Sequence, residues 1–178
     1  MPVPGADAML RQVHERLAAF PRQLKTVAPG HHHITLQFLG ETDADTAGRL
    51  REDFRALAGI AAQPCVLKGL GAFPGIRRPR VIWCGLDADI EALRRAQRAV
   101  EDITSRHGFP REIRPFSPHL TLARVRGEGK APVELGRYLA DNAATVYGET
   151  RFDRIVLFKS DLKKEGPIYT ALEEVPLG

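Results

Sequence analysis

Two short segments of this chain share one alternating pattern of polar and apolar residues. Residues 33–39 read HITLQFL and residues 119–125 read HLTLARV. Successive side chains of an extended strand point to opposite faces, so each segment places a histidine and a threonine on one face. A shift of one residue in register would bury the imidazoles and expose the leucines, so the pattern also determines which face is buried. The sequence therefore predicts two strands that each present His and Thr from the same face.

The alternation assigns each residue of the two segments to a face. In the first segment the polar face comprises His33, Thr35 and Gln37, and the apolar face comprises Ile34, Leu36 and Phe38. In the second segment the polar face comprises His119, Thr121 and Ala123, and the apolar packing comes from Leu120, Leu122 and Val125. Two such strands in one molecule predict a shared polar site to which each contributes a histidine.

Composition narrows the class of protein. The chain has 178 residues, 43% hydrophobic and 27% charged, which is ordinary for a globular protein with a sizeable core. No apolar run approaches the roughly 18–20 residues that span a bilayer, and the first residues lack the features of a secretory signal, so we expect a cytoplasmic protein. Cys65 and Cys84 match neither a disulfide framework nor a zinc motif and are expected to be buried free thiols. The formal net charge of +4 fits an anionic substrate.

Hydrophobic periodicity and the placement of Gly and Pro outline the other elements. Helices are predicted over residues 6–20, 44–57, 88–107 and 132–139, with Thr42 or Asp43 as the N-cap of the second. Strands are predicted over residues 24–28, 65–70, 81–86, 152–160 and 168–172, with loops at residues 71–80 and 127–130. Short connections between neighbouring strands favour antiparallel pairs, so the predicted fold class is α+β.

The distance between the two histidine segments predicts how the chain is organised. His33 and His119 lie 86 residues apart, close to half the chain. We therefore expect a single domain, residues 1–178, with two lobes related by a pseudo-two-fold axis. Antiparallel sheets would line a central groove, helices would cover the outside, and the two histidine strands would face each other across the groove.

Two imidazoles that flank a phosphate can supply both proton transfers that cleavage of a phosphodiester requires. Free histidine has a pKa of about 6.5, so near neutral pH one ring can accept a proton from water while the other donates one to the leaving oxygen. The hydroxyls of Thr35 and Thr121 can donate to phosphoryl oxygens, and Arg124 carries a guanidinium suited to phosphate. Strict alternation points Arg124 away from His119, so Arg124 requires a strand end or a bulge to reach the site. The scheme needs no metal ion and no cofactor.

The paired His-x-Thr-Leu segments resemble those of the 2H phosphoesterase superfamily, and most closely its RNA 2′,3′-cyclic phosphodiesterase branch, historically called 2′-5′ RNA ligase. The similarity extends from the first helix to the C-terminus. It includes FLGE at residues 38–41, GLGAFP at 69–74, RPRV at 78–81, RPFSP at 114–118 and VLFKS at 156–160.

The resemblance implies a bilobal α+β fold and metal-independent hydrolysis of RNA 2′,3′-cyclic phosphate ends to 2′-phosphomonoesters. By the family pattern, His33 is the proton donor to the leaving O3′ and His119 the proton acceptor from water. Reverse 2′-5′ ligation of RNA ends is also a property of the family. The implied partner is an RNA end, tRNA-like or other, with no membrane and no obligate protein partner.

The chain departs from the family pattern at two places. The family usually has a short apolar strand before the first helix, whereas only residues 1–4 (MPVP) stand there in this chain. Gln37 occupies a position that is often Lys in relatives, which removes one possible phosphate contact.

Several residues allow two interpretations. His31, His32 and His33 in a row could bind a metal, but adjacent strand residues point to opposite faces, and we expect His31 and His32 to be solvated. Possible RNA contacts are Phe73, Arg77, Arg78, Arg80 and Phe116; the arginines could instead be a solvated loop and the phenylalanines loop packing. His14 and His107 are expected to be exposed residues without a partner.

Two other functions are compatible with the sequence. One is a 2H esterase for small cyclic nucleotides such as ADP-ribose 1″,2″-cyclic phosphate. The other is a non-catalytic module that binds RNA ends through its basic loop.

Overall fold

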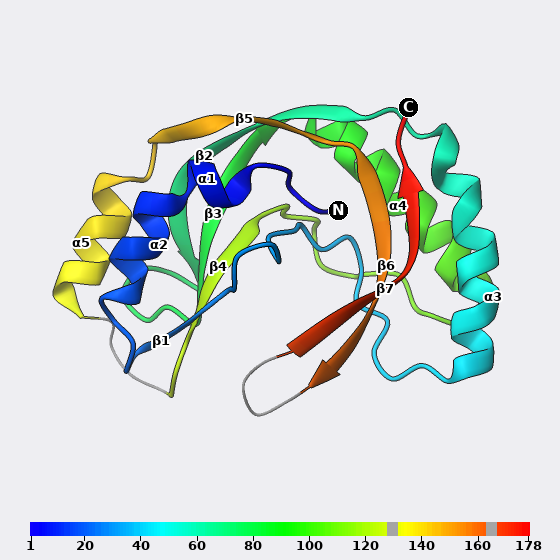
Figure 1. Cartoon of the computed structure of the whole chain (residues 1–178), viewed down its shortest axis with the longest axis horizontal. Coiled ribbons are helices and arrows are strands. Elements are labelled where there is room, and N and C mark those ends of the chain that lie inside the picture. Colours follow the sequence, from blue (N-terminus) through cyan, green and yellow to red (C-terminus); the bar gives the residue numbers. More distant parts are fainter. Residues whose placement is uncertain (128–131, 163–166) are drawn as a thin grey trace.

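A five-stranded antiparallel sheet forms one side of the molecule. The computed structural model describes residues 1–127, 132–162 and 167–178 (Figure 1); part of the predicted loop at residues 127–130 lies outside them. The strand order of the sheet is β1-β4-β3-β2-β5, with bounds β1 (Leu24–Thr26), β2 (Gln63–Phe73), β3 (Val81–Ala88), β4 (Leu120–Val125) and β5 (Val146–Phe152). A second antiparallel pair consists of β6 (Arg154–Leu162) and β7 (Pro167–Pro176). The predicted α+β class is confirmed.

The helices divide between the two sheets. Their bounds are α1 (Ala6–Met9), α2 (Arg11–Ala18), α3 (Ala44–Phe54), the 3₁₀ turn η1 (Arg55–Gly59), α4 (Ile90–Arg106) and α5 (Val133–Asp141). Helices α1, α2 and α5 pack on strands of the five-stranded sheet, whereas α3 contacts α4 and β7 (Figure 1). The long helices begin where side chains cap them: Asp43 accepts from the backbone N–H of Thr46, and Asp89 accepts from that of Ala92.

The single helix predicted over residues 6–20 is wrong. The chain breaks it at Leu10, whose backbone angles (φ −102°, ψ 13°) leave the helical region. The two pieces contact opposite edges of the sheet, α1 at β5 and α2 at β1. A straight helix could not follow both edges, so tertiary packing overrides the continuous periodicity of the sequence.

The first histidine segment is extended but is not a strand of either sheet. It forms an isolated antiparallel bridge between His33 and Pro2, flanked by hydrogen bonds in both directions between Met1 and Ile34, each 2.9 Å. The prediction of a regular strand here is therefore wrong. Residues 1–3 thus pair with residues 32–34 through backbone hydrogen bonds.

The alternation of burial in this segment is confirmed as far as Leu36. Ile34 and Leu36 are buried, and His33 and Thr35 are partly exposed. Phe38, predicted to share the apolar face, is instead 74% exposed. Among the described residues, the backbone pairing with residues 1–3 ends at Ile34, so strand geometry is not imposed as far as Phe38.

The chain passes repeatedly between the two sides of the molecule. The second histidine segment lies in β4 of the five-stranded sheet, while the first lies beside the β6–β7 pair, where His33 contacts Phe158 and Tyr169. Buried apolar residues from both sides form one core cluster, including Ile34, Leu122 and Ile155. No helix in the described part of the chain is long and apolar enough to cross a membrane.

Candidate active site

The two motif histidines are anchored in the same way. The Nδ1 atom of His33 lies 2.8 Å from the carbonyl oxygen of His31, and the Nδ1 atom of His119 lies 2.8 Å from the carbonyl oxygen of Ser117. A carbonyl oxygen can only accept, so in both rings Nδ1 carries the hydrogen. This bond to the residue two positions earlier leaves Nε2 of each ring as the nitrogen that can gain or lose a proton.

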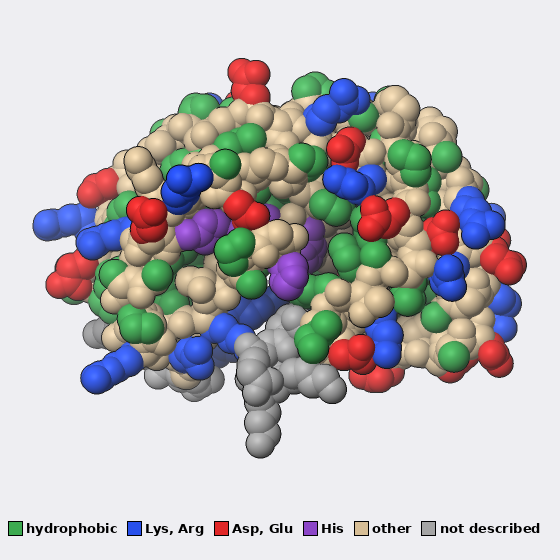
Figure 2. All heavy atoms as spheres, in the orientation of Figure 1, with side chains coloured by type: hydrophobic (Ala, Val, Ile, Leu, Met, Phe, Trp, Pro, Cys, Tyr) green, Lys and Arg blue, Asp and Glu red, His purple; other side chains and the backbone are tan. Residues whose placement is uncertain are grey.

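Aromatic rings from neighbouring strands pack against each histidine. The ring of His33 lies 5.5 Å from Tyr169 of β7, near perpendicular, and 6.2 Å from Phe158 of β6. The ring of His119 lies 4.9 Å from Phe73 of β2, with an interplanar angle of 81°. The contacts with Tyr169 and Phe73 are edge-to-face and that with Phe158 is tilted, and together they restrict the orientation of each imidazole. Figure 2 shows histidine side chains gathered in the hollowed middle of one face of the molecule.

Burial also affects the titration of the first histidine. The surrounding protein lowers the pKa of His33 from its ordinary value, chiefly because burial disfavours the imidazolium. In the free protein, His33 therefore stays neutral down to a lower pH than an exposed histidine does.

A β-bulge in β4 resolves the orientation of Arg124. Thr121 pairs with Trp83 and Ala123 with Ile82, so Leu122 is an extra residue on its strand. Leu122 and Ala123 are accordingly both buried, and Arg124 is exposed. The prediction that Ala123 lies on the polar face with His119 is therefore wrong, because the bulge interrupts the alternation. Because the extra residue restarts the alternation, Arg124 returns to the face that carries Thr121. Of the two possibilities that the sequence left open for Arg124, a strand end or a bulge, the structure shows the bulge.

Next to Phe73, the five-stranded sheet carries a residue that the sequence pattern did not indicate. The indole of Trp83 covers Gly71, where an added Cβ would lie 2.2 Å from the ring, and it packs 5.3 Å from Phe73. Trp83 also pairs across the strands with Thr121. Only the pairing of β2, β3 and β4 brings these residues together, so no local signal in the sequence could have found Trp83.

The predicted RNA-contact residues occupy different environments. Arg77, Arg78 and Arg80 are exposed on the loop between β2 and β3, and the backbone of Arg80 bonds to both Phe73 and Val125. Phe73 is partly buried against His119 and Trp83. Phe116 is half-buried and packs against the core, which favours the packing interpretation for this residue.

His32 is not solvated, and that expectation is wrong. It lies on the buried face with Ile34 and is 4% exposed; its Nδ1 lies 2.7 Å from Asp7 Oδ1 and its Nε2 3.0 Å from His14 Nε2. Burial lowers the pKa of both His32 and His14. Within the described residues, no group of three or more His, Cys, Asp or Glu is arranged to hold a metal ion.

His14 and His107 both have partners, contrary to the expectation from the sequence. His14 faces His32, and the Nε2 atom of His107 lies 2.8 Å from Asp53 Oδ2. Both partners come from segments distant in sequence, which a helical pattern cannot reveal. Cys65 and Cys84 are buried free thiols, as predicted, and burial raises the pKa of both, to about 11 and about 12.

Comparison with known proteins identifies the class to which this fold and these paired segments belong. The model of the 2′-5′ RNA ligase superfamily matches residues 11–164, and the chain belongs to this superfamily. The resemblance seen in the sequence is confirmed.

Individual relatives cover nearly the whole chain. A protein of Aeropyrum pernix named RNA 2′,3′-cyclic phosphodiesterase is 37% identical over 168 residues, covering 93% of each chain. A protein of the same name from Aquifex aeolicus is 33% identical, covering 86% of this chain and 82% of the relative. The crystal structure of a Thermus thermophilus protein is 30% identical with a TM-score of 0.75, covering 96% of this chain and 91% of that one. The structure of Escherichia coli LigT complexed with 3′-AMP shares the fold at 24% identity, with a TM-score of 0.69 and 97% and 91% coverage.

Proposed function

We propose that this protein hydrolyses RNA 2′,3′-cyclic phosphate ends to 2′-phosphomonoesters by acid–base catalysis with His33 and His119. The observation that carries the proposal is the matched anchoring of Nδ1 in both rings, which leaves two Nε2 atoms for proton transfer. The names of the relatives at 37% and 33% identity support the same reaction. A single bilobal domain, residues 1–178, would hold the substrate between its two histidine segments.

The mechanism assigns one proton transfer to each imidazole. His119 Nε2 takes a proton from the attacking water as the new P–O bond forms, and His33 Nε2–H gives its proton to O3′ as the P–O3′ bond breaks. The product keeps its phosphate on O2′ and gains a free 3′-hydroxyl. If an RNA 5′-hydroxyl attacks in place of water, the same steps form a 2′-5′ phosphodiester, which accounts for ligation.

The remaining site residues stabilise the phosphoryl group. The hydroxyls of Thr35 and Thr121 donate to its non-bridging oxygens, and Arg124, on the face of Thr121, supplies positive charge. The exposed Arg77, Arg78 and Arg80 would contact phosphates of the preceding nucleotides. The scheme uses no metal ion or cofactor, and its partner is an RNA end in the cytoplasm.

The reaction is tested with purified protein in EDTA and an oligoribonucleotide that ends in a 2′,3′-cyclic phosphate. We expect turnover to a terminal 2′-phosphate, identified by its position on the ribose. A 3′-phosphate product would mean that O2′, and not O3′, is the leaving oxygen. Binding without turnover, unchanged in a His33→Ala/His119→Ala protein, would favour the RNA-end-binding module, and preferential turnover of a small cyclic nucleotide in competition would favour the small-molecule esterase.

Two titrating imidazoles predict a bell-shaped dependence of kcat/KM on pH, because one must be protonated while the other is neutral. His33 must be protonated to act as the acid, so it sets the limb on which kcat/KM falls as the pH rises. Since burial lowers the pKa of His33, we expect the midpoint of this limb below about pH 6.5. In the kcat profile the bound phosphate stabilises the imidazolium, so the same limb moves to higher pH. Initial rates between about pH 5 and 8 measure both profiles, and the His33→Ala profile should lack this limb. A flat profile in the wild-type protein contradicts the scheme.

A further inference from the structure

Helix α4 carries a buried polar stripe on an otherwise apolar buried face. Gln97, Glu101 and Thr104 are 8%, 6% and 0% exposed, and their spacing places them on one side of the helix. Burying a carboxylate or an amide is unfavourable unless each is hydrogen-bonded. The partners of this stripe therefore indicate what it holds in place.

On one side, the stripe holds the first histidine segment just after Thr35. The Nε2 atom of Gln97 donates to the backbone carbonyl of Leu36 at 3.3 Å. The hydroxyl of Thr104 donates to Oε1 of the Gln37 side chain at 2.7 Å. Gln37, which the sequence placed on the polar face with His33, is thus bonded to α4.

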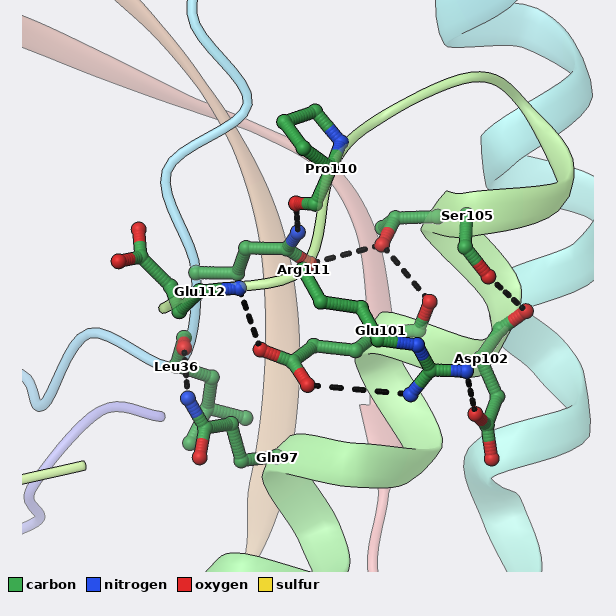
Figure 3. Close-up of polar contacts among 10 residues, drawn as sticks. Leu36, Gln97, Glu101, Asp102, Ser105, Pro110, Arg111 and Glu112 are labelled. Atoms are coloured by element: carbon green, nitrogen blue, oxygen red, sulfur yellow. Dashed lines mark hydrogen bonds and ion pairs between the residues drawn. The ribbon is translucent and has the colours of Figure 1, made fainter. Parts of the chain in front are cut away.

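On the other side, the stripe holds the segment that leads to His119. Oε1 of Glu101 accepts from the backbone N–H of Glu112 at 3.1 Å, and Oε2 lies 3.9 Å from the Arg111 guanidinium (Figure 3). Arg111 is fixed further by Asp102, 2.6 Å away. Residues 109–119 contain no helix or strand, so these contacts replace the backbone ladder that would otherwise order the segment.

One side chain joins the two segments directly. The amide of Gln37 accepts from Thr104 and donates to the carbonyl oxygen of Pro110 at 3.0 Å. The first histidine segment, α4 and the segment before the second histidine are therefore connected through short polar contacts.

We propose that Gln37 and Glu101 are positioning residues that fix the separation of His33 and His119 through the polar stripe of α4. This inference rests on the proposed function, in which one phosphoryl group must reach both Nε2 atoms. Displacing a reacting group by about 1 Å can cost about 10²-fold in rate, so the stripe acts on kcat more than on substrate binding.

The decisive variant is Glu101→Leu. It removes both contacts of Glu101, one to the Arg111 guanidinium and one to the backbone N–H of Glu112. Arg111, which loses Glu101 as a partner, is half exposed and keeps its contact with Asp102, so we expect the variant to stay folded with only a modest change in melting temperature. At the same time, we expect kcat for the cyclic-phosphate oligoribonucleotide to fall about tenfold or more, with KM changed much less. A loss that came only from unfolding could not combine these results.

Matched variants separate positioning from general effects. Glu101→Gln keeps an acceptor for the Glu112 N–H and should recover most of kcat. Glu91→Gln makes the same chemical change at an exposed residue of α4 that pairs with Arg94, and should leave kcat within about twofold. If Glu101→Leu does not fold, Gln37→Met and Thr104→Val test the proposal instead. Each removes the hydrogen bond between Thr104 and Gln37, which holds the first histidine segment on α4.

Two outcomes overturn the proposal. One is a folded Glu101→Leu protein with wild-type kcat, and the other is a loss of kcat/KM that lies entirely in KM. A wild-type protein without turnover overturns the proposed function instead. Positioning is then judged by NMR: the ring signals of His33 and His119 must shift in Glu101→Leu while those of His14 stay in place, and unmoved rings refute it.

Discussion

Replacing His33 with alanine lowers kcat for hydrolysis of a cyclic-phosphate oligoribonucleotide by about 10²–10⁴-fold, the usual contribution of one positioned proton transfer. If His33 protonates the leaving O3′, a substrate with sulfur in place of O3′ should recover most of this loss, because a thiolate leaves without a proton. The measurement is single-turnover kinetics of both substrates with wild-type and His33→Ala protein, which isolates the chemical step.

His119→Ala provides the comparison for this experiment. It should lose a similar factor in kcat, but the sulfur substrate should not restore it, because His119 acts on the attacking water. His107→Ala is the histidine control: its ring bonds to Asp53, and its removal should leave kcat of the folded protein unchanged. Rescue of His119→Ala in place of His33→Ala would exchange the two roles, and rescue of neither variant would contradict the assignment of a proton donor.

Replacing Ile34 with alanine should cost about 2–5 kcal/mol in the free energy of unfolding, whereas Phe38→Ala should change it by less than about 0.5 kcal/mol. Ile34 is 0% exposed and belongs to the core cluster, so its truncation leaves a cavity. Phe38, four residues later in the same segment, is 74% exposed and loses little packing.

Urea denaturation of the two variants measures this difference, with the slope of the transition compared to verify that both unfold in the same way. Because both substitutions shorten a large apolar side chain in one motif, each serves as the control for the other. Equal losses of stability would mean that Phe38 is buried as the alternation alone predicts, and that the segment remains a regular strand beyond Leu36.

The burial of residues in the two motifs could be predicted where it depends on the local alternation of the strand. Alternation assigned Ile34 and Leu36 to the core, and the same argument showed that Arg124 needs a strand end or a bulge to share the face of Thr121. The prediction failed for His32, which the alternation itself places beside Ile34 but which was expected to be solvated. A buried imidazole needs a polar partner, and Asp7 supplies it from a segment that the pattern of the motif does not include.

The sequence by itself determined the two histidine segments, the burial of Ile34 and Leu36, the α+β class and the start of α3, because strand alternation and capping depend on residues a few positions apart. The tertiary structure alone decided that Tyr169 and Phe73 pack on the two imidazoles, that Gln37 bonds to α4, and that the first helix breaks at Leu10. These contacts join segments far apart along the chain. Their partners are selected by packing and by the need to satisfy buried polar groups, which no local pattern specifies.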